Sequence, residues 1–512
     1  MFVRIHTAAL AGIDAVHVTV EVNITGGGLG LFLVGLPDNA VKESEQRIRS
    51  AFENSGEKMS GRKVVVNLAP ADLRKEGASF DLPIAVGILA AMERIEGDLL
   101  AETMVAGELS LDGSVMPVRG VLSLAIAARQ AGLKRLILPI DNAAEAAVVD
   151  GLEVIGVQCL RQVIDYLNGD AQIAPTHTVE PTVELREEGR YAEDFRDVKG
   201  QSHVKRALEI AAAGGHNVLM IGSPGSGKTM LARRLPTILP LLTTDEALET
   251  TKIHSVAGLQ RFEGLMSYRP FRAPHHTASP VSLIGGGQTP HPGEVSLAHN
   301  GVLFLDELPE FGRSVLEVLR QPLEDREIVV SRARYSVRYP ANFTLVAAMN
   351  PCPCGYYNHP SKECACSPSA VHRYMGRISG PLMDRIDMHI EVTPVEPQEL
   401  HAAAEGESSA SIRERVARAR AIQRDRFRGI EGVYTNARMN TAMLRDYCQL
   451  DAASTRLLRR AMEQLSLSAR AYDRILKVTR TIADLEGVAD ITAAHIAEAI
   501  GYRSLDRENW GR

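Results

Sequence analysis

The stretch Asn217-Val-Leu-Met-Ile-Gly222-Ser-Pro-Gly-Ser-Gly-Lys228-Thr229 decides the fold. Its first five residues are an apolar run typical of a buried strand, and a glycine-rich turn follows that fits G-x-x-x-x-G-K-[ST]. Glycines let backbone N–H groups surround phosphates, Lys228 adds a positive charge and the Thr229 hydroxyl can bind Mg²⁺. A chance glycine-rich turn is the alternative, but the position between strand and helix favours a phosphate-binding loop. We predict that ATP is held by Gly222, Ser223, Pro224, Gly225, Ser226, Gly227, Lys228 and Thr229.

A second motif, which is acidic, adds to this prediction. The apolar run Val302-Leu-Phe-Leu ends in Asp306 and Glu307. Asp306 is expected to hold Mg²⁺ together with Thr229, and Glu307 to polarise the attacking water. An apolar run followed by Asp-Glu is a weak signal alone, but beside a phosphate-binding loop it predicts ATP hydrolysis. Asn350, after the next apolar run, is expected to bridge that water and the γ-phosphate; the alternative is that it caps a strand–turn junction.

ATP hydrolysis of this kind also needs a cation on the γ-phosphate. Arg385 and Arg470 are the candidates, although spacing alone favours a surface arginine in a salt bridge for either of them. An arginine donated by a neighbouring subunit requires a ring, so we expect a homo-oligomer.

Composition limits the class of protein. The chain has 512 residues, which predicts two to three domains, and a net charge of −6, which gives no overall attraction to nucleic acid. Any DNA contact must therefore come from local basic clusters. No signal peptide is recognisable, and the most apolar stretch, residues 82–92, is too short to cross a bilayer. We expect a cytoplasmic protein with no membrane contact.

Four regions follow one another along the chain. Residues 1–170 alternate strand-like and helical runs and predict an α/β domain. Residues 171–194 are polar, with prolines and a charged run, and predict a linker. Residues 195–396 alternate helices with buried strands, as in a parallel sheet, and residues 397–512 are helical.

The order of these motifs resembles that of the Mg-chelatase-like AAA+ ATPases, and in particular the ComM/YifB group of competence-related proteins. The resemblance implies an α/β fold with a P-loop AAA+ core and a C-terminal helical lid. It also implies a hexameric, ATP-driven helicase that promotes DNA branch migration in homologous recombination and natural transformation, with single-stranded or branched DNA and a recombinase as partners. Arg385 would be the arginine finger and Arg470 a second sensor. The motifs are Phe271-Arg-Ala-Pro-His-His-Thr277, Pro292-Gly-Glu-Val-Ser-Leu-Ala-His-Asn-Gly301, Met349-Asn-Pro-Cys-Pro-Cys-Gly355 and Thr479-Arg-Thr-Ile-Ala-Asp484.

The same resemblance implies two β-hairpins that point into the pore of the ring, over residues 282–294 and 327–340. The second hairpin carries arginines around a turn with an interleaved tyrosine, which suits a nucleic-acid backbone and its bases. A solvated hairpin with ordinary surface charge is an equal alternative. The predicted DNA-binding residues are Arg332, Arg334 and Arg338.

The N-terminal domain resembles the S5-like proteolytic domain of Lon. Ser79 falls at the position of the Lon nucleophile, but Leu122 stands at the position of the lysine base, and leucine cannot take a proton. The nearby Arg119 stays protonated and is a poor base. We therefore expect a scaffold or DNA-contacting module; an ATP-dependent protease remains one alternative function, and a chelatase-type motor subunit that remodels a protein partner is another.

Four cysteines lie close together in the sequence and predict a structural Zn²⁺ site, with His359 or His372 as replacement ligands. The spacing C-x-C is tighter than the usual C-x-x-C, so four unligated cysteines in a loop are the alternative. The predicted ligands are Cys352, Cys354, Cys364 and Cys366.

Overall fold

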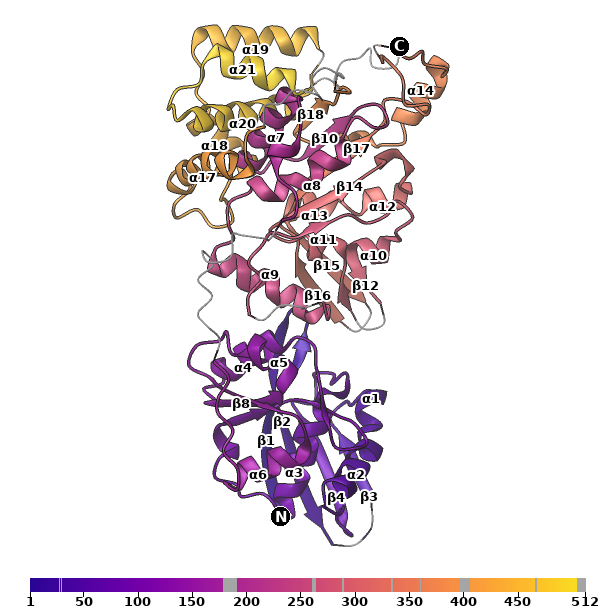
Figure 1. The fold of residues 1–512 in the computed structure, drawn as a ribbon, viewed down its shortest axis with the longest axis vertical. Coiled ribbons are helices and arrows are strands. Elements are labelled where there is room, and N and C mark those ends of the chain that lie inside the picture. The colour runs from indigo at the N-terminus through magenta and orange to yellow at the C-terminus, as the bar shows by residue number, and fades with distance from the viewer. Residues whose placement is uncertain are drawn as a thin grey trace. The chain divides into compact units, whose positions relative to one another are not determined.

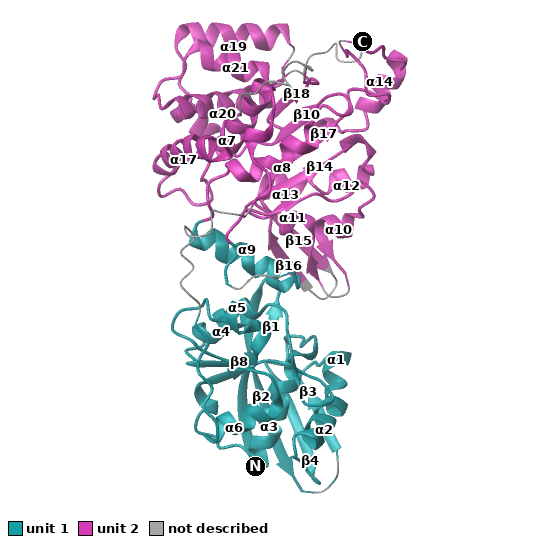
Figure 2. Ribbon diagram, in the orientation of Figure 1, with its two compact units in different colours: residues 1–185, 243–266 teal, residues 186–242, 267–512 magenta. Residues whose placement is uncertain are grey.

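A computed structural model divides the chain into two compact units, drawn in different colours in Figure 2. Unit 1 contains residues 1–185 and 243–266, and unit 2 contains residues 186–242 and 267–512. The residues that the structure describes are 1–26, 28, 30–177, 191–259, 264–287, 290–332, 335–359, 361–395, 406–465 and 467–503.

Unit 1 is built on one seven-stranded sheet in the order β3-β4-β2-β1-β5-β8-β9 (Figure 1). β1 pairs antiparallel with β2, which pairs antiparallel with β4, whereas β1, β5, β8 and β9 run parallel. The strands are β1 (Phe2–Ala11), β2 (Asp14–Thr25), β3 (Gly30–Val34), β4 (Lys63–Ala69), β5 (Thr103–Val105), β8 (Arg135–Pro139) and β9 (Glu153–Val157); β6 (Glu108–Leu109) and β7 (Val115–Met116) form a separate small hairpin.

Each face of this sheet carries its own hydrophobic cluster. Successive side chains of a strand point to opposite faces, so Ile5 packs with the cluster around α3 while Ala8 packs with the cluster around α4. All residues of α3 are buried, which explains why its sequence is apolar around the whole helix. The helices are α1 (Asn39–Lys42), α2 (Ser44–Asn54), α3 (Asp81–Ala91), α4 (Val121–Gln130), α5 (Ile140–Ala146) and α6 (Leu160–Leu167).

A segment from the middle of the chain completes unit 1. α9 (Thr244–Val256) packs on α4, and Leu248 and Leu265 lie against the cluster on that face. The Gly120 N–H donates to the Ser255 carbonyl, at 3.3 Å. Residues 243–266 fall within the region that the sequence assigns to the ATPase core, yet they pack with the N-terminal unit.

Unit 2 contains a five-stranded sheet in the order β11-β14-β17-β10-β18, and every neighbouring pair is parallel. The α/β class with a parallel sheet is thus as predicted. In such a sheet, ligands bind at the carboxyl ends of the strands. The elements are β10 (Val218–Ile221), β11 (Phe271–Arg272), β14 (Val302–Leu305), β17 (Thr344–Met349), β18 (Met388–Glu391), α7 (Ser202–Gly214), α8 (Lys228–Ile238), α12 (Arg313–Glu317), α13 (Arg320–Asp325), α14 (Pro368–Met375) and α15 (Gly380–Met383).

The C-terminal helices share one hydrophobic cluster with this sheet and its covering helices. Val416 and Ile475 from the C-terminal part pack in the same cluster as Met220 and Leu231. The predicted lid therefore belongs to the same compact unit as the core; the start of that lid, residues 397–405, lies outside the described residues. The helices are α17 (Ser409–Arg426), α18 (Thr441–Tyr447), α19 (Ala452–Gln464), α20 (Ala469–Glu486) and α21 (Ala493–Gly501).

A buried ionic contact joins α20 to the sheet. Asp387, directly before β18, pairs with Arg474 of α20 and also accepts a hydrogen bond from the Asn217 N–H, at 2.8 Å. His216 lies 3.9 Å from the same carboxylate, and its Nε2 is 2.8 Å from the Thr481 hydroxyl of α20. Burial alone would raise the pKa of Asp387, but the neighbouring positive charges, Arg474 first, and the Asn217 N–H outweigh it and lower that pKa. The carboxylate is therefore charged and fixes the helical part to the strand that leads into the P-loop.

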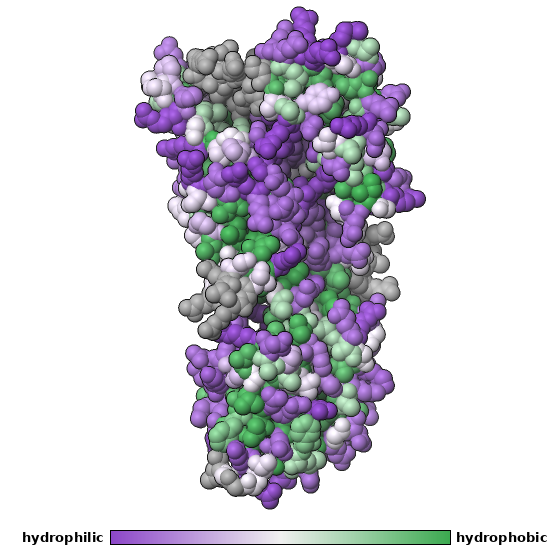
Figure 3. All heavy atoms as spheres, turned by 180° about the vertical axis from the view of Figure 1, so that it is seen from behind, coloured by the Kyte–Doolittle hydropathy of each residue, from purple (hydrophilic) through white to green (hydrophobic). Residues whose placement is uncertain are grey.

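Hydrophilic residues cover most of the face of unit 2 that is visible in Figure 3, with apolar residues in small groups between them. Among the described residues, no helix is both long enough and apolar enough to cross a bilayer.

Candidate ATP site

The predicted P-loop joins β10 to α8 and needs its glycines. Gly225 and Gly227 have φ angles of 78° and 91°, in the left-handed region that glycine adopts without strain. At Gly222 a side chain has no room, because a Cβ there would lie 2.3 Å from the Val392 carbonyl oxygen of the neighbouring chain segment. The Gly222 N–H donates to the Met349 carbonyl, at 3.2 Å, which ties the loop to the end of β17.

Lys228 points back into the loop. Its Nζ donates to the carbonyls of Gly222 and Ser223, at 2.7 and 3.0 Å, and to Asn350 Oδ1, at 3.2 Å. Burial lowers the pKa of Lys228, and the charges of Asp306 and Glu307 act against that change. A lysine whose ammonium points into the loop in this way can exchange these carbonyls for phosphate oxygens.

The acidic motif meets the P-loop at the carboxyl end of β14. The Thr229 hydroxyl donates to Asp306 Oδ2, at 2.7 Å, so the two predicted Mg²⁺ ligands lie side by side. These hydroxyl and carboxylate oxygens fit Mg²⁺, which is usually bound by one or two protein ligands together with phosphates and water. Glu307 has a φ of 52° and its N–H donates to Asp306 Oδ1, at 2.9 Å. A left-handed backbone at a residue other than glycine costs energy and is concentrated at functional sites.

His276 is a contact of this site to which sequence reasoning gave no role. Its Nδ1 lies 3.4 Å from Glu307 Oε2, and its ring meets Phe311 edge-on, with 6.4 Å between the ring centroids. His276 follows β11, whose carboxyl end lies beside that of β14 in the sheet. The motif Phe271–Thr277 contained this residue, but only the strand order shows that its histidine reaches the predicted general base.

The two candidate arginines lie near each other in unit 2, because Arg470 pairs with Asp384, the residue before Arg385. The Arg385 guanidinium pairs with Glu324, at 2.5 Å, and only 11% of its side chain is exposed. Arg470, at the start of α20, pairs with Asp384 at 3.1 Å, and 65% of its side chain is exposed. Both arginines therefore have carboxylate partners within their own subunit, and their predicted roles depend on assembly.

The hairpin predicted over residues 327–340 is present. β15 (Glu327–Arg332) and β16 (Tyr335–Pro340) pair antiparallel from Glu327↔Pro340 to Arg332↔Tyr335. Arg338 is exposed, with its guanidinium 3.7 Å from the Glu327 carboxylate. Arg334 and the side chain of Arg332 lie outside the described part of the chain.

The hairpin predicted over residues 282–294 is present but shorter than predicted. Ser279 caps a short helix, α10 (Pro280–Ile284), because its hydroxyl accepts the Ser282 N–H and Pro280 suits the first helical position. Only β12 (Gly285–Gly286) and β13 (His291–Pro292) pair as strands, before α11 (Glu294–Leu297) begins. The Tyr339 hydroxyl donates to the Pro290 carbonyl, at 2.9 Å, so this short hairpin packs beside β16 (Figure 1).

The four cysteines come together after β17. The Cys352 sulfur lies 3.3 Å from that of Cys354 and 3.7 Å from that of Cys364, and all four sulfurs lie within 4.8 Å of one another. Four thiolates around Zn²⁺, at Zn–S distances of about 2.3 Å, would lie roughly 3.8 Å apart, so the cluster fits tetrahedral zinc. In the described part of the chain the ligand group consists of these four residues, without His359 or His372.

In unit 1, Leu122 and Ser79, the two residues compared with the base and the nucleophile of Lon, make structural contacts. Leu122 is fully buried in α4, and its N–H donates to Glu145 Oε1, at 3.1 Å. Ser79 lies in the turn before α3, where its carbonyl accepts the Gly107 N–H, at 3.0 Å. Lys75 is buried, and its ammonium donates to the carbonyls of Pro70 and Leu73. These two bonds tie the Lys75 ammonium to the loop that contains Pro70 and Leu73.

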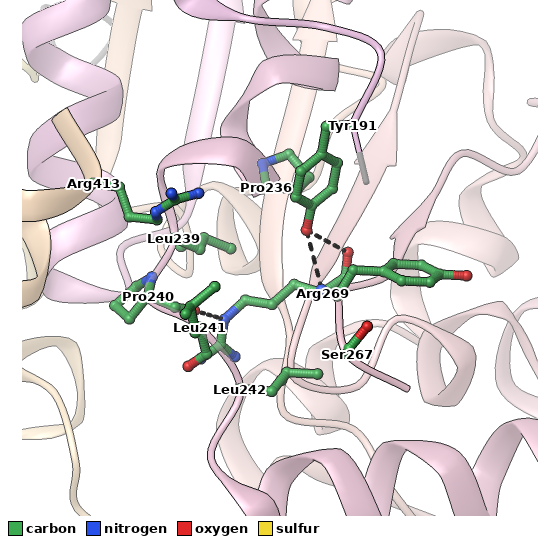
Figure 4. A pocket seen from close by; sticks show the side chains of 10 residues that line it. Tyr191, Pro236, Leu239, Pro240, Leu241, Leu242, Ser267, Arg269 and Arg413 are labelled. Carbon is green, nitrogen blue, oxygen red and sulfur yellow. Dashed lines mark hydrogen bonds between the residues drawn. The ribbon is translucent and has the colours of Figure 1, made fainter. Parts of the chain in front are cut away.

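A small pocket elsewhere in unit 2 is shown in Figure 4. Its wall includes Tyr191, whose hydroxyl accepts the Arg269 N–H, at 3.1 Å. Arg269 in turn donates to the Asn300 carbonyl, at 2.7 Å. The lining includes no P-loop residue, and these bonds anchor the end of the predicted linker, of which residues 178–190 lie outside the described part.

Three family models match the chain and together cover most of it. The model "Magnesium chelatase, subunit ChlI" matches residues 194–400, "Subunit ChlI of Mg-chelatase" matches residues 20–142, and "Magnesium chelatase, subunit ChlI C-terminal" matches residues 406–503. The matches thus include the P-loop, the acidic motif and the C-terminal helices.

Curated relatives match over nearly the full length. The competence protein ComM of Haemophilus influenzae is 46% identical over 505 residues, which are 98% of this chain and 97% of that protein. The protein YifB of Escherichia coli is 43% identical over 508 residues, again 98% and 97% of the two chains. Lon protease 2 of Bacillus subtilis matches only in part, at 31% identity over 139 residues, which are 27% of this chain and 25% of that protein.

Proposed function

This chain belongs to the ComM/YifB family of Mg-chelatase-like AAA+ proteins, and we propose that it is a hexameric ATPase that translocates along single-stranded or branched DNA. The motor would promote branch migration in homologous recombination and natural transformation. In this proposal it works in the cytoplasm, beside a recombinase.

The observation that carries the proposal is the link between the hairpins and the ATP site. β16 leads within a few residues into β17, which ends one residue before Asn350, a contact of Lys228. The short hairpin β12–β13 leads through α11 into β14, which ends one residue before Asp306. Each hairpin is therefore covalently connected to a strand whose end contacts the nucleotide site. A shift of these strand ends on ATP hydrolysis can move the hairpins, and a motor requires such a movement.

The chemistry proposed for the site uses Lys228 to bind the β- and γ-phosphates and Thr229 with Asp306 to hold Mg²⁺. When bound, Mg²⁺ would neutralise charge on the phosphates. Glu307, oriented by His276, would polarise the attacking water, and Asn350 would position that water.

The proposed ring supplies the missing cation. Arg385 would leave Glu324 and contact the γ-phosphate of the neighbouring subunit, while Arg470 would leave Asp384 and sense the nucleotide in its own subunit. Exchange of a carboxylate for a phosphate keeps each guanidinium paired in both states, so the rearrangement leaves no cation unpaired.

A chelatase-type motor that remodels a protein partner is the second candidate, and the descriptions of the matching family models favour it. Such a motor has no reason to bind DNA. An ATP-dependent protease is less well supported, because Leu122 offers no base and the likeness to Lon protease 2 is partial.

The first test replaces Arg332, Arg334 and Arg338 together with alanine. If these arginines contact phosphates, affinity for single-stranded DNA at low salt should fall about tenfold or more, and the slope of log K against log [salt] should become shallower by about 0.7 per lost contact. Fluorescence anisotropy over a salt series measures both quantities.

A matched control removes the same charge from an exposed surface of α17 and the turn after it, in the triple variant Arg418→Ala, Arg424→Ala and Arg428→Ala. This control should bind DNA as the unchanged protein does. Equal losses in the two variants would mean that net charge alone attracts DNA, and no loss in the hairpin variant would remove the hairpin from the proposal.

A further inference from the structure

The cysteine loop forms one wall of the P-loop. Gly355, the residue after Cys354, has a φ of 85° and lies against Pro224. A Cβ at Gly355 would approach the Pro224 ring carbons to 2.5 and 2.7 Å, closer than atoms can pack without movement. The Gly355 N–H also donates to the carbonyl of buried Cys352, at 3.0 Å. The turn that carries two of the thiols is thus in direct contact with the loop that binds phosphate.

The start of the same loop contacts the P-loop a second time. Met349 accepts the Gly222 N–H through its carbonyl, and the Asn350 side chain accepts from Lys228. Tyr374 of α14, after the last cysteine, lies close enough to the Asn350 backbone for that backbone to lower the pKa of the Tyr374 hydroxyl, against the larger effect of burial. Both ends of the cysteine loop therefore return to the segment that touches Gly222 and Lys228.

The part between these contacts is held by local bonds, in which the Ser361 and Lys362 N–H groups donate to His359 Nδ1. In the described residues between β17 and α14, the backbone forms turns and bends without a helix or strand. Fixing such a loop costs conformational entropy, and a metal that links its two halves reduces the freedom that is lost. Cys352 and Cys354 lie on the half beside Pro224, and Cys364 and Cys366 lie on the other half.

We propose that Zn²⁺ bound by Cys352, Cys354, Cys364 and Cys366 holds the P-loop in its nucleotide-binding conformation, so that metal occupancy sets the affinity for ATP. The inference rests on the proposed ATP site. All four positions around the metal would be filled by thiolates, so the ion takes no part in hydrolysis. It acts by positioning Gly355 and Asn350 against Pro224 and Lys228.

The first experiment compares purified protein as isolated, after removal of zinc by a chelator, and after reloading, with Mg²⁺ restored throughout. A chromogenic chelator counts zinc per chain, and a fluorescent ATP analogue gives the nucleotide Kd. We expect one zinc per chain, a Kd at least about tenfold weaker after removal, and recovery on reloading.

The second experiment keeps the thiols and removes only the contact. Gly355→Ala places a methyl group against Pro224, so it should weaken the nucleotide Kd at full zinc content. Gly432→Ala is the control, because Gly432 also has a positive φ, 76°, but a Cβ there meets nothing within 4 Å. The control carries the same backbone strain and should bind nucleotide normally.

The possible outcomes test the coupling, the metal site and the ATP site one by one. A zinc-loaded protein whose nucleotide Kd stays within about twofold after zinc removal, or a Gly355→Ala variant that matches Gly432→Ala, would overturn the coupling. Absence of zinc after reloading would overturn the metal site and with it the coupling. Failure of the unaltered, zinc-loaded protein to bind the ATP analogue would instead contradict the ATP site on which the inference rests.

Discussion

Glu307→Gln is expected to lower ATP hydrolysis by at least about a hundredfold while leaving ATP binding nearly unchanged, because a general base contributes roughly 10²–10⁴ in rate. The amide has the size of the carboxylate but cannot polarise water. Lys228, Thr229 and Asp306, which would bind the nucleotide, keep their contacts. Steady-state hydrolysis and the Kd of a fluorescent ATP analogue measure the two effects separately.

Glu317→Gln serves as the matched control, since Glu317 is a half-exposed carboxylate of α12 that pairs with Arg320 at 2.6 Å. It should hydrolyse ATP at the normal rate. Normal hydrolysis by Glu307→Gln would remove Glu307 from the role of base, and a large loss of ATP affinity in that variant would place Glu307 in binding instead.

Asp387→Ala is expected to destabilise unit 2 by about 3–5 kcal/mol, because removing one partner of a buried ion pair leaves the other charge without compensation. Arg474 would lose its buried carboxylate, and the Asn217 N–H would lose its acceptor. This contact links two elements, since Asn217 directly precedes β10 and Arg474 lies in α20. The helical part and the P-loop strand should therefore loosen together.

Hydrogen–deuterium exchange measures this loosening in β10 and α20 separately from unit 1, which avoids treating a two-unit chain as a single transition. Asp425→Ala is the control, because Asp425 and Arg428 form an ion pair with 73% and 82% of their side chains exposed. A surface pair of this kind contributes about 0–1 kcal/mol. If protection in Asp387→Ala equals that in Asp425→Ala, the buried contact does not join α20 to the sheet.

Local sequence patterns were sufficient to predict the centre of unit 2. The apolar runs before Gly222 and Asp306 are strands with the expected ends, and parallel pairing brings Thr229 and Asp306 together. Each of these features depends on a few adjacent residues whose backbone conformation and chemistry are read from the motif itself.

Contacts between distant segments could not be predicted in this way. Helical periodicity does not reveal with which unit α9 packs, because that depends on the contact of Leu248 with the hydrophobic cluster around α4. In the same way, the His276–Glu307 contact requires β11 to lie beside β14, and the contact of Gly355 with Pro224 requires the folded cysteine loop. The first hairpin is shorter than predicted, because the helix that starts at Ser279-Pro280 continues to Ile284.

The central claim, that ATP hydrolysis is coupled to DNA, is tested most directly by the hydrolysis rate of the full chain at low salt. The rate should be measured with no nucleic acid, single-stranded DNA, duplex DNA and a mobile four-way junction, with Glu307→Gln to exclude a contaminating ATPase. We predict strong stimulation by single-stranded or branched DNA that is lost in Glu307→Gln. Hydrolysis that proceeds at the same rate with every DNA would contradict the motor and favour a protein partner as the substrate.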